Sequence, residues 1–168
     1  KKEGYLTLPG KEHMGRFEDL EAKARIGAFS VFDMEAMVPE LEKLKENEIY
    51  LEIGVDKGKS LSIARMVAHP KAVVCGIDLR EDPKVEGTKF FQGNSQEIVH
   101  RWAYTLNMWK VSLLFIDGDH SYEGCKADID LWFPHMKEHG VMMFHDCDES
   151  SPGVVQAVAE FVNTHTVN

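Results

Sequence analysis

The chain has 168 residues and a mass of 19.1 kDa, with 43% apolar and 28% charged residues. A chain of this size and composition buries one hydrophobic core, which excludes a disordered protein, a collagen-like protein and a disulfide scaffold. The formal net charge of −9 repels phosphate backbones and no local basic patch offsets it, so we expect no nucleic-acid partner. No apolar run reaches the roughly 18 residues of a membrane span, and no signal peptide opens the chain, so we expect no membrane partner. The three cysteines form no C-x-x-C pair, which indicates a reducing compartment and a cytoplasmic location.

Residues 1–48 precede the first strand-like run and divide into a part without a regular apolar period and a part with a helical one. The segment up to Arg16 mixes glycine, proline and charges without a sustained period, which predicts an arm or loop. From there to about Asn47 the apolar residues fall three and four positions apart, which indicates two amphipathic helices. Ser30 or Asp33 is the candidate N-cap of the second helix. We expect this N-terminal segment to lie on the substrate side of the molecule.

From residue 49 to residue 168, short apolar runs alternate with helical periodicity. The predicted strands cover residues 49–54, 72–77, 89–92, 111–116 and 140–144, and the predicted helices cover residues 60–68, 95–104, 122–136 and 153–162. Alternating strands and helices, with strands apolar on both faces, predict a doubly wound, mainly parallel α/β sheet. The chain stops directly after the last helix, so we expect the core to be truncated at its C-terminus. An uncovered sheet edge pairs readily with another chain, which favours a homo-oligomer.

A glycine-rich turn follows the first predicted strand. Gly54 and Gly58 allow a tight turn and a close approach of the backbone to a ligand, and Ser60 lies in the first turn of the helix that follows. The G-x-x-x-G spacing fits neither the dinucleotide fingerprint nor the phosphate loop. Glu52, two positions before the first glycine, favours a cationic ligand if it faces the site; the alternative is an ordinary acid at a strand end.

The second predicted strand leads into Asp78, at the position where a carboxylate typically accepts hydrogen bonds from ribose hydroxyls. A glycine turn with an acid, followed by a ribose-binding acid, indicates a site for an unphosphorylated, positively charged nucleoside. S-adenosylmethionine is such a molecule, and we predict it as the cofactor. Asn94 and Ser95 follow the third strand, where polar side chains are expected to reach the adenine ring.

Acidic and histidine side chains follow the fourth and fifth predicted strands. The fourth strand leads into Asp117, Asp119 and His120, and the fifth leads into His145 and Asp146. These strands are neighbours in a doubly wound sheet, so their carboxylates converge, which is costly unless a cation lies between them. Oxygen and imidazole ligands suit Mg²⁺ or a transition metal such as Mn²⁺. Asp119 is alternatively only a cap for the following helix, a role for which Ser121 competes.

The run Phe115–Gly124, which reads FIDGDHSYEG, and the later His145–Asp146 pair resemble one family of class I S-adenosylmethionine-dependent methyltransferases. That family is similar to the metal-dependent O-methyltransferases that act on catechols, caffeoyl thioesters and macrolide sugars. The resemblance implies a Rossmann-like methyltransferase sheet, here without the C-terminal antiparallel strand pair that the superfamily usually carries. It also implies that Asp117 and Asp146 bind a divalent metal, that His120 is the general base, and that Asp119 orients His120 or contacts the cofactor.

Two departures from the related enzymes leave the metal site open. His145 stands where the antibiotic-sugar enzymes carry glutamate, and Cys147 stands where the catechol enzymes carry an asparagine ligand. We include His145 as the third candidate ligand, and the choice between Mg²⁺ and Mn²⁺ stays open. The predicted activity is metal-assisted O-methylation of a small-molecule or sugar hydroxyl. The alternatives are an enzyme that binds S-adenosylmethionine for different chemistry and a nucleoside- or metal-binding module without catalytic activity.

Overall fold

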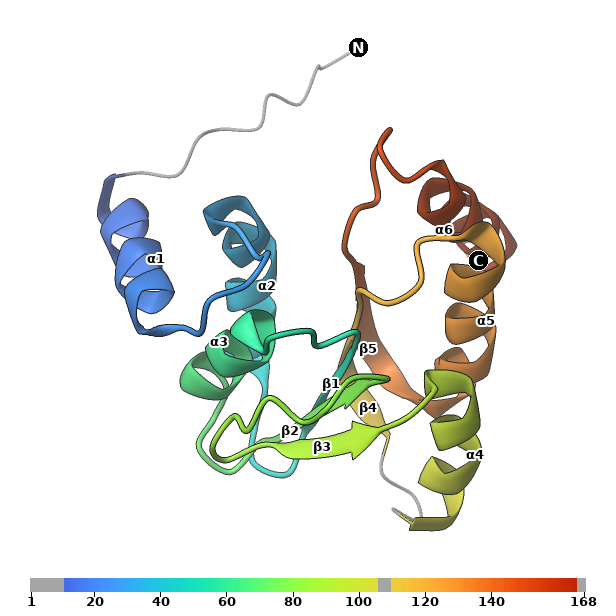
Figure 1. Ribbon diagram of the computed structural model, residues 1–168, viewed down its shortest axis with the longest axis horizontal. Coiled ribbons are helices and arrows are strands. Elements are labelled where there is room, and N and C mark those ends of the chain that lie inside the picture. The colour runs from blue at the N-terminus through green and yellow to red at the C-terminus, as the bar shows by residue number, and fades with distance from the viewer. Residues whose placement is uncertain (1–10, 106–109, 166–168) are drawn as a thin grey trace.

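The computed structural model describes residues 11–105 and 110–165, which form one layered α/β unit (Figure 1). Its elements in chain order are α1 (Lys11–Lys23), α2 (Val31–Lys43), β1 (Ile49–Ile53), α3 (Lys59–Val67), β2 (Val73–Asp78), β3 (Lys89–Gln92), α4 (Ser95–Thr105), β4 (Val111–Ile116), α5 (Tyr122–Trp132), the 3₁₀ helix η1 (Phe133–His135), β5 (Met136–Phe144) and α6 (Pro152–His165). Residues 1–10, and with them most of the predicted N-terminal arm, lie outside the described residues.

The five strands form one parallel sheet in the order β3-β2-β1-β4-β5. The chain builds outward from β1 to β3 and then returns to the other side of β1 for β4 and β5. Strand order therefore reverses between β1 and β4, and ligands of open α/β sheets bind beyond the carboxyl ends of the strands at such a point. The doubly wound α/β prediction is confirmed. In the described part of the chain, no antiparallel pair follows α6.

Helices lie on both faces of the sheet (Figure 1). Helices α2 and α3 pack on the face that carries Tyr50, Val74 and Leu113, and α1 packs on the outer side of α2 and α3. Helices α4, α5 and α6 pack on the opposite face, against side chains such as Leu51 and Leu114. Successive strand residues point to opposite faces, which is why neighbouring positions in β1 and β4 divide between the two cores. Within the described residues, no helix has the length and hydropathy needed to cross a membrane.

The N-terminal helices belong to the same packed body as the sheet. Ser30 is the N-cap of α2, and a capping box joins it to Asp33: each side chain bonds the backbone N–H of the other residue. Helix α1 begins at Lys11, so the prediction of an arm as far as Arg16 was wrong for its last residues. The buried ring of Phe17 anchors α1 to the core, and a helix anchored in this way extends through polar residues with adequate propensity.

The boundary between α5 and β5 also differs from the prediction. Helix α5 ends at Trp132 instead of Met136, because Pro134 lacks an amide hydrogen and the chain tightens into η1. Strand β5 then begins at Met136, four residues earlier than predicted, and its register with β4 shifts before Val141. Beyond this irregularity β5 pairs regularly with β4, which carries Phe144 and the residues after it to the same sheet edge as Asp117.

Candidate active site

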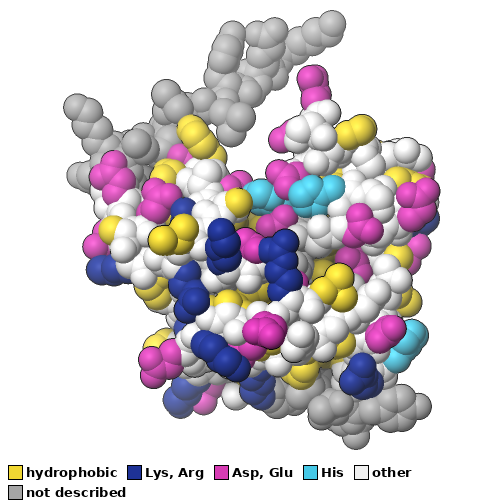
Figure 2. All heavy atoms as spheres, viewed as in Figure 1, with side chains coloured by type: hydrophobic (Ala, Val, Ile, Leu, Met, Phe, Trp, Pro, Cys, Tyr) yellow, Lys and Arg dark blue, Asp and Glu magenta, His cyan; other side chains and the backbone are white. Residues whose placement is uncertain are grey.

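A cleft of about 640 Å³ opens at the carboxyl ends of the strands, where strand order reverses. Figure 2 shows histidine and acidic side chains gathered in a hollow between the two layers of helices. The residues that line the cleft are Ala28, Ile53, Gly54, Asp56, Ile77, Asp78, Leu79, Arg80, Gly93, Asn94, Ser95, Gln96, Asp117, Gly118, Asp119, His120, Asp128, His145 and Asp146. Most of the predicted site residues are among them, but Glu52, Gly58 and Ser60 are not.

The turn after β1 requires glycine at its first position. Gly54 has φ +87°, a left-handed conformation, and its N–H donates to the carbonyl oxygen of Ile77 over 2.9 Å. A Cβ atom at Gly54 would collide with the carbonyl oxygen of Asp117. The turns that follow β1 and β4 are therefore in direct backbone contact at the floor of the cleft. Gly58, with φ +82°, instead caps the N-terminus of α3, outside the cleft lining.

Glu52 lies beneath the cleft and does not face it, which corrects the expectation that this carboxylate meets a cationic ligand. The side chain is 0% exposed. Its Oε2 accepts a hydrogen bond from the Tyr50 hydroxyl over 2.7 Å, and its Oε1 accepts one from the Ser60 hydroxyl. Burial raises the pKa of Glu52 to about 8 against the opposing effect of these two hydrogen bonds. Glu52 and Ser60 thus join β1 to α3 behind the glycine turn.

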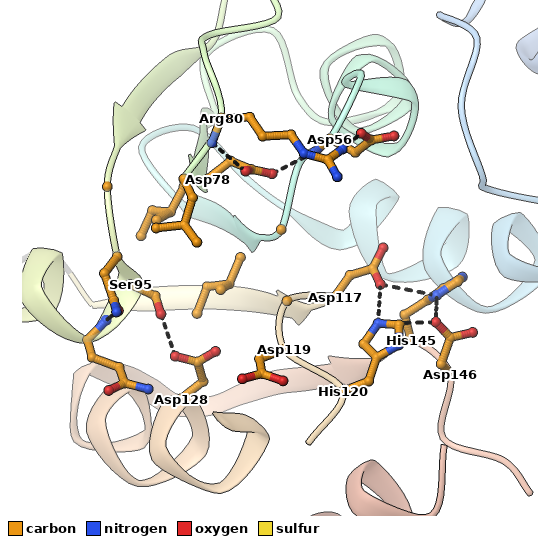
Figure 3. Close-up of a pocket in the computed structure, with 18 of the residues that line it drawn as sticks. Asp56, Asp78, Arg80, Ser95, Asp117, Asp119, His120, Asp128, His145 and Asp146 are labelled. Atoms are coloured by element: carbon orange, nitrogen blue, oxygen red, sulfur yellow. Dashed lines mark hydrogen bonds and ion pairs between the residues drawn. The ribbon is translucent and has the colours of Figure 1, made fainter. Parts of the chain in front are cut away.

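Asp78 organises the same turn from the cleft side. Its Oδ2 accepts from the backbone N–H groups of Val55 and Asp56, each over 2.7 Å, and its Oδ1 accepts from the N–H of Arg80 over 2.8 Å. The Arg80 guanidinium forms an ion pair with the Asp56 carboxylate at the rim (Figure 3). A carboxylate has about four acceptor positions, so Asp78 keeps about one for a ligand hydroxyl.

The segment after β3 forms the end of the cleft farthest from the histidines (Figure 3). The Asn94 side chain accepts from the N–H of Gln96 over 2.8 Å and so begins α4. The Ser95 hydroxyl donates to Oδ1 of Asp128 over 2.5 Å. Asp128 comes from α5 and is only 3% exposed, and burial raises its pKa to about 6. The sequence prediction included Asn94 and Ser95 but assigned no site role to Asp128.

Two carboxylates and two imidazoles meet at the opposite end of the cleft (Figure 3). His145 Nδ1 lies 3.2 Å from Oδ1 of Asp117 and 2.9 Å from Oδ2 of Asp146. His120 Nε2 lies 3.6 Å and 3.3 Å from the same two oxygens. Asp117 and Asp146 therefore converge as the neighbouring positions of β4 and β5 required, and both histidines bridge them.

The electrostatics of this cluster favour positive charge between the carboxylates. The Asp117 carboxylate, 3.2 Å from Nδ1, raises the pKa of His145 to about 10; the Asp146 carboxylate adds to this rise, and burial opposes it. Asp146 has φ +49°, a strained conformation for a residue with a side chain, and such strain is concentrated at functional sites. Ligand atoms of Asp117, His120 and Asp146 all lie within 4.8 Å of one another, a spacing that fits a divalent metal. The histidine in this group of three is His120, whereas the sequence predicted His145 as the third metal ligand.

Asp119 occupies the loop between β4 and α5. Ser121 is the N-cap of α5, since its hydroxyl accepts from the N–H of Gly124 over 3.0 Å. Asp119 supports this start of the helix by accepting from the N–H of Ser121 over 2.8 Å, and it also lines the cleft. Its proposed contact with the cofactor stays a prediction.

Two residues of the N-terminal segment, Phe29 and Asp33, lie next to His145, and the sequence identified neither as a site residue. Asp33, the partner of Ser30 in the capping box, places Oδ2 3.5 Å from Nε2 of His145. The ring of Phe29 stacks on His145 with centroids 6.3 Å apart and an angle of 26°. The sequence carried only the capping signal for Asp33, and nothing local linked it to a residue more than 100 positions away.

The sheet order, the glycine turn and the acidic strand ends together define the fold of a class I S-adenosylmethionine-dependent methyltransferase. Solved structures share it. CalS11, a TDP-rhamnose 3'-O-methyltransferase of calicheamicin biosynthesis, aligns with a TM-score of 0.61 at 16% identity, over 90% of this chain and 84% of its own. The MycE methyltransferase of the mycinamycin pathway, in complex with Mg and SAH, aligns with a TM-score of 0.67 at 17% identity, over 89% of this chain and 49% of its own. At these identities the similarity is one of fold.

The sequence profile described as "methyltransferase domain" matches residues 51–147, which is more than half of the chain, and the chain belongs to this family. Among curated proteins, the uncharacterised protein R132 of Acanthamoeba polyphaga mimivirus is 29% identical over 135 residues. That alignment covers 70% of this chain and 61% of R132, so the chain spans about three-fifths of this relative's length.

Proposed function

We propose that this domain transfers the methyl group of S-adenosylmethionine to a hydroxyl oxygen of a small molecule or sugar, with the help of a divalent metal. The observation that carries the proposal is the arrangement of the cleft. A nucleoside-compatible half, built from the glycine turn and Asp78, is continuous with a cluster of two carboxylates and two imidazoles. A methyl donor and an activated oxygen need this kind of adjacency, because the displacement is in line and positioning supplies much of the rate.

The glycine turn and Asp78 form the donor half of the cleft. Gly54 leaves the backbone open for close approach, and Asp78 keeps an acceptor position beside its three backbone hydrogen bonds. A ribose hydroxyl fits that position, since it can donate to the carboxylate. Asn94 and Ser95 would then lie on the base side, and Asp117 and Asp119 on the side of the amino-acid chain.

Asp117 and Asp146 would hold the metal, with His145 or His120 as a nitrogen ligand. With an imidazole nitrogen among the ligands, the site suits Mn²⁺ better than Mg²⁺. With oxygen ligands alone, it suits either ion. When bound, a divalent ion lowers the pKa of a coordinated hydroxyl and fixes its position. The Nε2 atom of His145 faces Asp33, and this carboxylate is suited to orient the imidazole, as partners of metal-binding histidines commonly do.

His120 would take the proton from the acceptor hydroxyl. The imidazole is about half exposed and lines the cleft, so an incoming substrate can reach it. Removal of the proton increases the nucleophilicity of the oxygen, and imidazole is suited to proton transfer near neutral pH. Its neighbours Asp117 and Asp146 would stabilise the imidazolium that forms.

Two proteins of similar fold support the oxygen acceptor and the metal. CalS11 is a TDP-rhamnose 3'-O-methyltransferase, and MycE was solved in complex with Mg and SAH. A homo-oligomer and a hydroxyl-bearing small molecule as partners remain parts of the same proposal.

The test is a methyl-transfer assay on a panel of sugars and phenols, with Mg²⁺, with Mn²⁺ and in excess EDTA. We expect turnover with metal, none after chelation, and none in His120→Ala, which should still bind S-adenosylhomocysteine in calorimetry and Mn²⁺ in spin-resonance titration. His139→Ala is the matched control, because His139 is exposed and lies outside the cleft.

Each part of the proposal has its own contrary result. Full activity in EDTA would remove the metal, and loss of Mn²⁺ binding in His120→Ala would make His120 a ligand instead of the base. Binding of S-adenosylhomocysteine without turnover on any hydroxyl would favour the alternative of a nucleoside-binding module.

A further inference from the structure

The loop between α1 and α2, residues 24–30, contacts both halves of the cleft. Its second half borders the cleft at Ala28, and the next residue, Phe29, stacks on His145 of the carboxylate–imidazole cluster. Its first half packs against the glycine turn and the start of α3, and Figure 1 shows the loop beside α3. The loop therefore joins the donor half of the cleft to the cluster.

Arg25 makes two hydrogen bonds that fix the first half of this loop. Its guanidinium Nε donates to the carbonyl oxygen of Lys57 over 2.9 Å, and its backbone N–H donates to the Ser62 hydroxyl over 3.2 Å. Lys57 belongs to the glycine turn, between Gly54 and Gly58. Hydrogen bonds from a charged donor are stronger than neutral ones, so Arg25 ties the loop to the turn firmly.

Close packing on α3 supports the same contact. A Cβ atom at Gly27 would lie 2.9 Å from Cβ of Lys59, so the loop backbone lies directly on the first residue of α3. The Lys59 side chain is only 12% exposed, and it forms an ion pair with Glu21 of α1 over 2.8 Å. The end of α1 and the loop are therefore docked together on the start of α3.

The other end of the loop leads to the residues that hold His145. The buried Phe29 ring stacks on the imidazole, and Asp33, fixed by its capping box with Ser30, faces Nε2 from 3.5 Å. The two carboxylates of the cluster lie on the Nδ1 side. The imidazole is thus held from both sides, and a side chain that is already held in place loses less freedom when a ligand binds.

We propose that Arg25 is a positioning residue for the metal site: it docks the loop on the glycine turn, keeps Phe29 and Asp33 against His145, and thereby makes cofactor and metal bind cooperatively. This inference rests on the proposed function, because it assumes a cofactor at the glycine turn and a divalent metal at the cluster. A cofactor that fixes the glycine turn also fixes the carbonyl group on which Arg25 docks. Coupling between two binding sites is reciprocal, so the metal strengthens cofactor binding by the same factor.

The experiment measures the coupling factor, which is the ratio of the Mn²⁺ affinities with and without saturating S-adenosylhomocysteine. Spin-resonance titration gives these affinities, and calorimetry gives the reciprocal ratio for S-adenosylhomocysteine with and without Mn²⁺. This probe lacks the sulfonium charge of the methyl donor, so repulsion between that charge and the ion does not enter. For the unaltered protein we expect both ratios to be about fivefold or more and equal to each other.

Three variants of the loop test the role of Arg25. Arg25→Ala removes the guanidinium and keeps the backbone hydrogen bond to Ser62, and the side chain is exposed, so we expect a folded protein in which the coupling is lost. Arg25→Lys keeps a charged donor and should restore part of the coupling. Gly27→Ala places a methyl group against Lys59 and should weaken the coupling by displacing the loop.

Arg16→Gln is the matched control. Arg16 belongs to the same helical segment, but it forms an exposed ion pair with Glu42, away from the loop. The coupling factor of the unaltered protein should persist in this variant. An equal loss in Arg16→Gln and Arg25→Ala would overturn the inference, because any disturbance of the segment would then have the same effect.

Two further results would overturn the inference and leave the proposed function standing. One is equal Mn²⁺ affinity of the unaltered protein with and without S-adenosylhomocysteine. The other is a coupling factor that persists in Arg25→Ala, since cofactor and metal would then influence each other without the docked loop. If the unaltered protein failed to bind S-adenosylhomocysteine or Mn²⁺, the proposed function would fail together with the inference.

Discussion

Glu52→Gln removes a buried ionisable group and changes the side chain very little in size. The carboxyl group is wholly buried between β1 and α3, and its pKa is raised to about 8, mainly by burial. Glutamine can still accept a hydrogen bond from the Tyr50 hydroxyl and donate one to the Ser60 hydroxyl oxygen. The substitution therefore tests the ionisation of Glu52 and leaves the packing in place.

The expected effect follows from the direction of the pKa shift. The folded protein holds the Glu52 proton up to about pH 8, whereas the unfolded chain releases it near the ordinary value of 4.5. Stability from the protonated form is complete below the unfolded pKa and is lost as the pH rises through the folded one. Between about pH 5 and about pH 7 the loss amounts to about 2 to 3 kcal/mol.

Urea unfolding of the unaltered protein and of Glu52→Gln at these two pH values measures the difference. The difference in the free energy of unfolding between Glu52→Gln and the unaltered protein should shift in favour of the variant by about 2 kcal/mol or more from the lower to the higher pH. The other titrating groups are common to both proteins and cancel in this difference. Glu46→Gln is the control: Glu46 is half exposed and paired with Lys71, and a surface pair of this kind contributes about 1 kcal/mol or less. A difference between Glu52→Gln and the unaltered protein that does not change with pH would refute the reasoning.

Two further predictions concern the glycine turn and the thiols. Gly54→Ala should lower the free energy of unfolding by about 2 kcal/mol or more, measured by urea denaturation, because the new methyl group meets the Asp117 carbonyl oxygen and φ is positive. Of the three cysteines, only exposed Cys147 should react quickly with a thiol reagent at neutral pH. Burial covers Cys75 and Cys125 and raises their pKa to about 12 and about 11.

These two predictions have simple controls. Gly87→Ala also places a methyl group at positive φ, but its nearest neighbour is the flexible Arg65 side chain at 3.3 Å, so its loss of stability should be smaller than that of Gly54→Ala. An equal loss in both variants would contradict the backbone collision as the cause. For the thiols, labelling of more than one cysteine per folded chain at the fast rate would contradict the burial argument, and unfolding should expose all three.

The local pattern of residues in the sequence predicted most of the helices and strands. The strands at residues 89–92 and 111–116 lie where short apolar runs predicted them, and Ser30 caps its helix as its residue type indicated. The convergence of Asp117 and Asp146 also followed from the sequence, because the carboxyl ends of neighbouring parallel strands share one edge. The family resemblance rested on the same residues and is confirmed.

The direction of Glu52 shows where the argument from the glycine motif failed. Side chains two positions apart in a strand share a face, and Tyr50 packs with α2 and α3, so Glu52 had to point the same way. The two-residue period of side chains along a strand therefore already fixed the face on which Glu52 lies. Whether an acid on that face meets a ligand or the underside of a helix depended on where α3 packs.

The sequence by itself determined the order of strands and helices, the glycine turn and the set of acids at the strand ends, because hydrophobic period and turn chemistry act over a few residues. Only the tertiary structure decided which distant side chains meet. It brought Asp33 and Phe29 from the N-terminal segment to His145, and it turned Asp128 of α5 toward Ser95. Such contacts depend on the packing of whole elements across the sheet, and no short stretch of sequence encodes them.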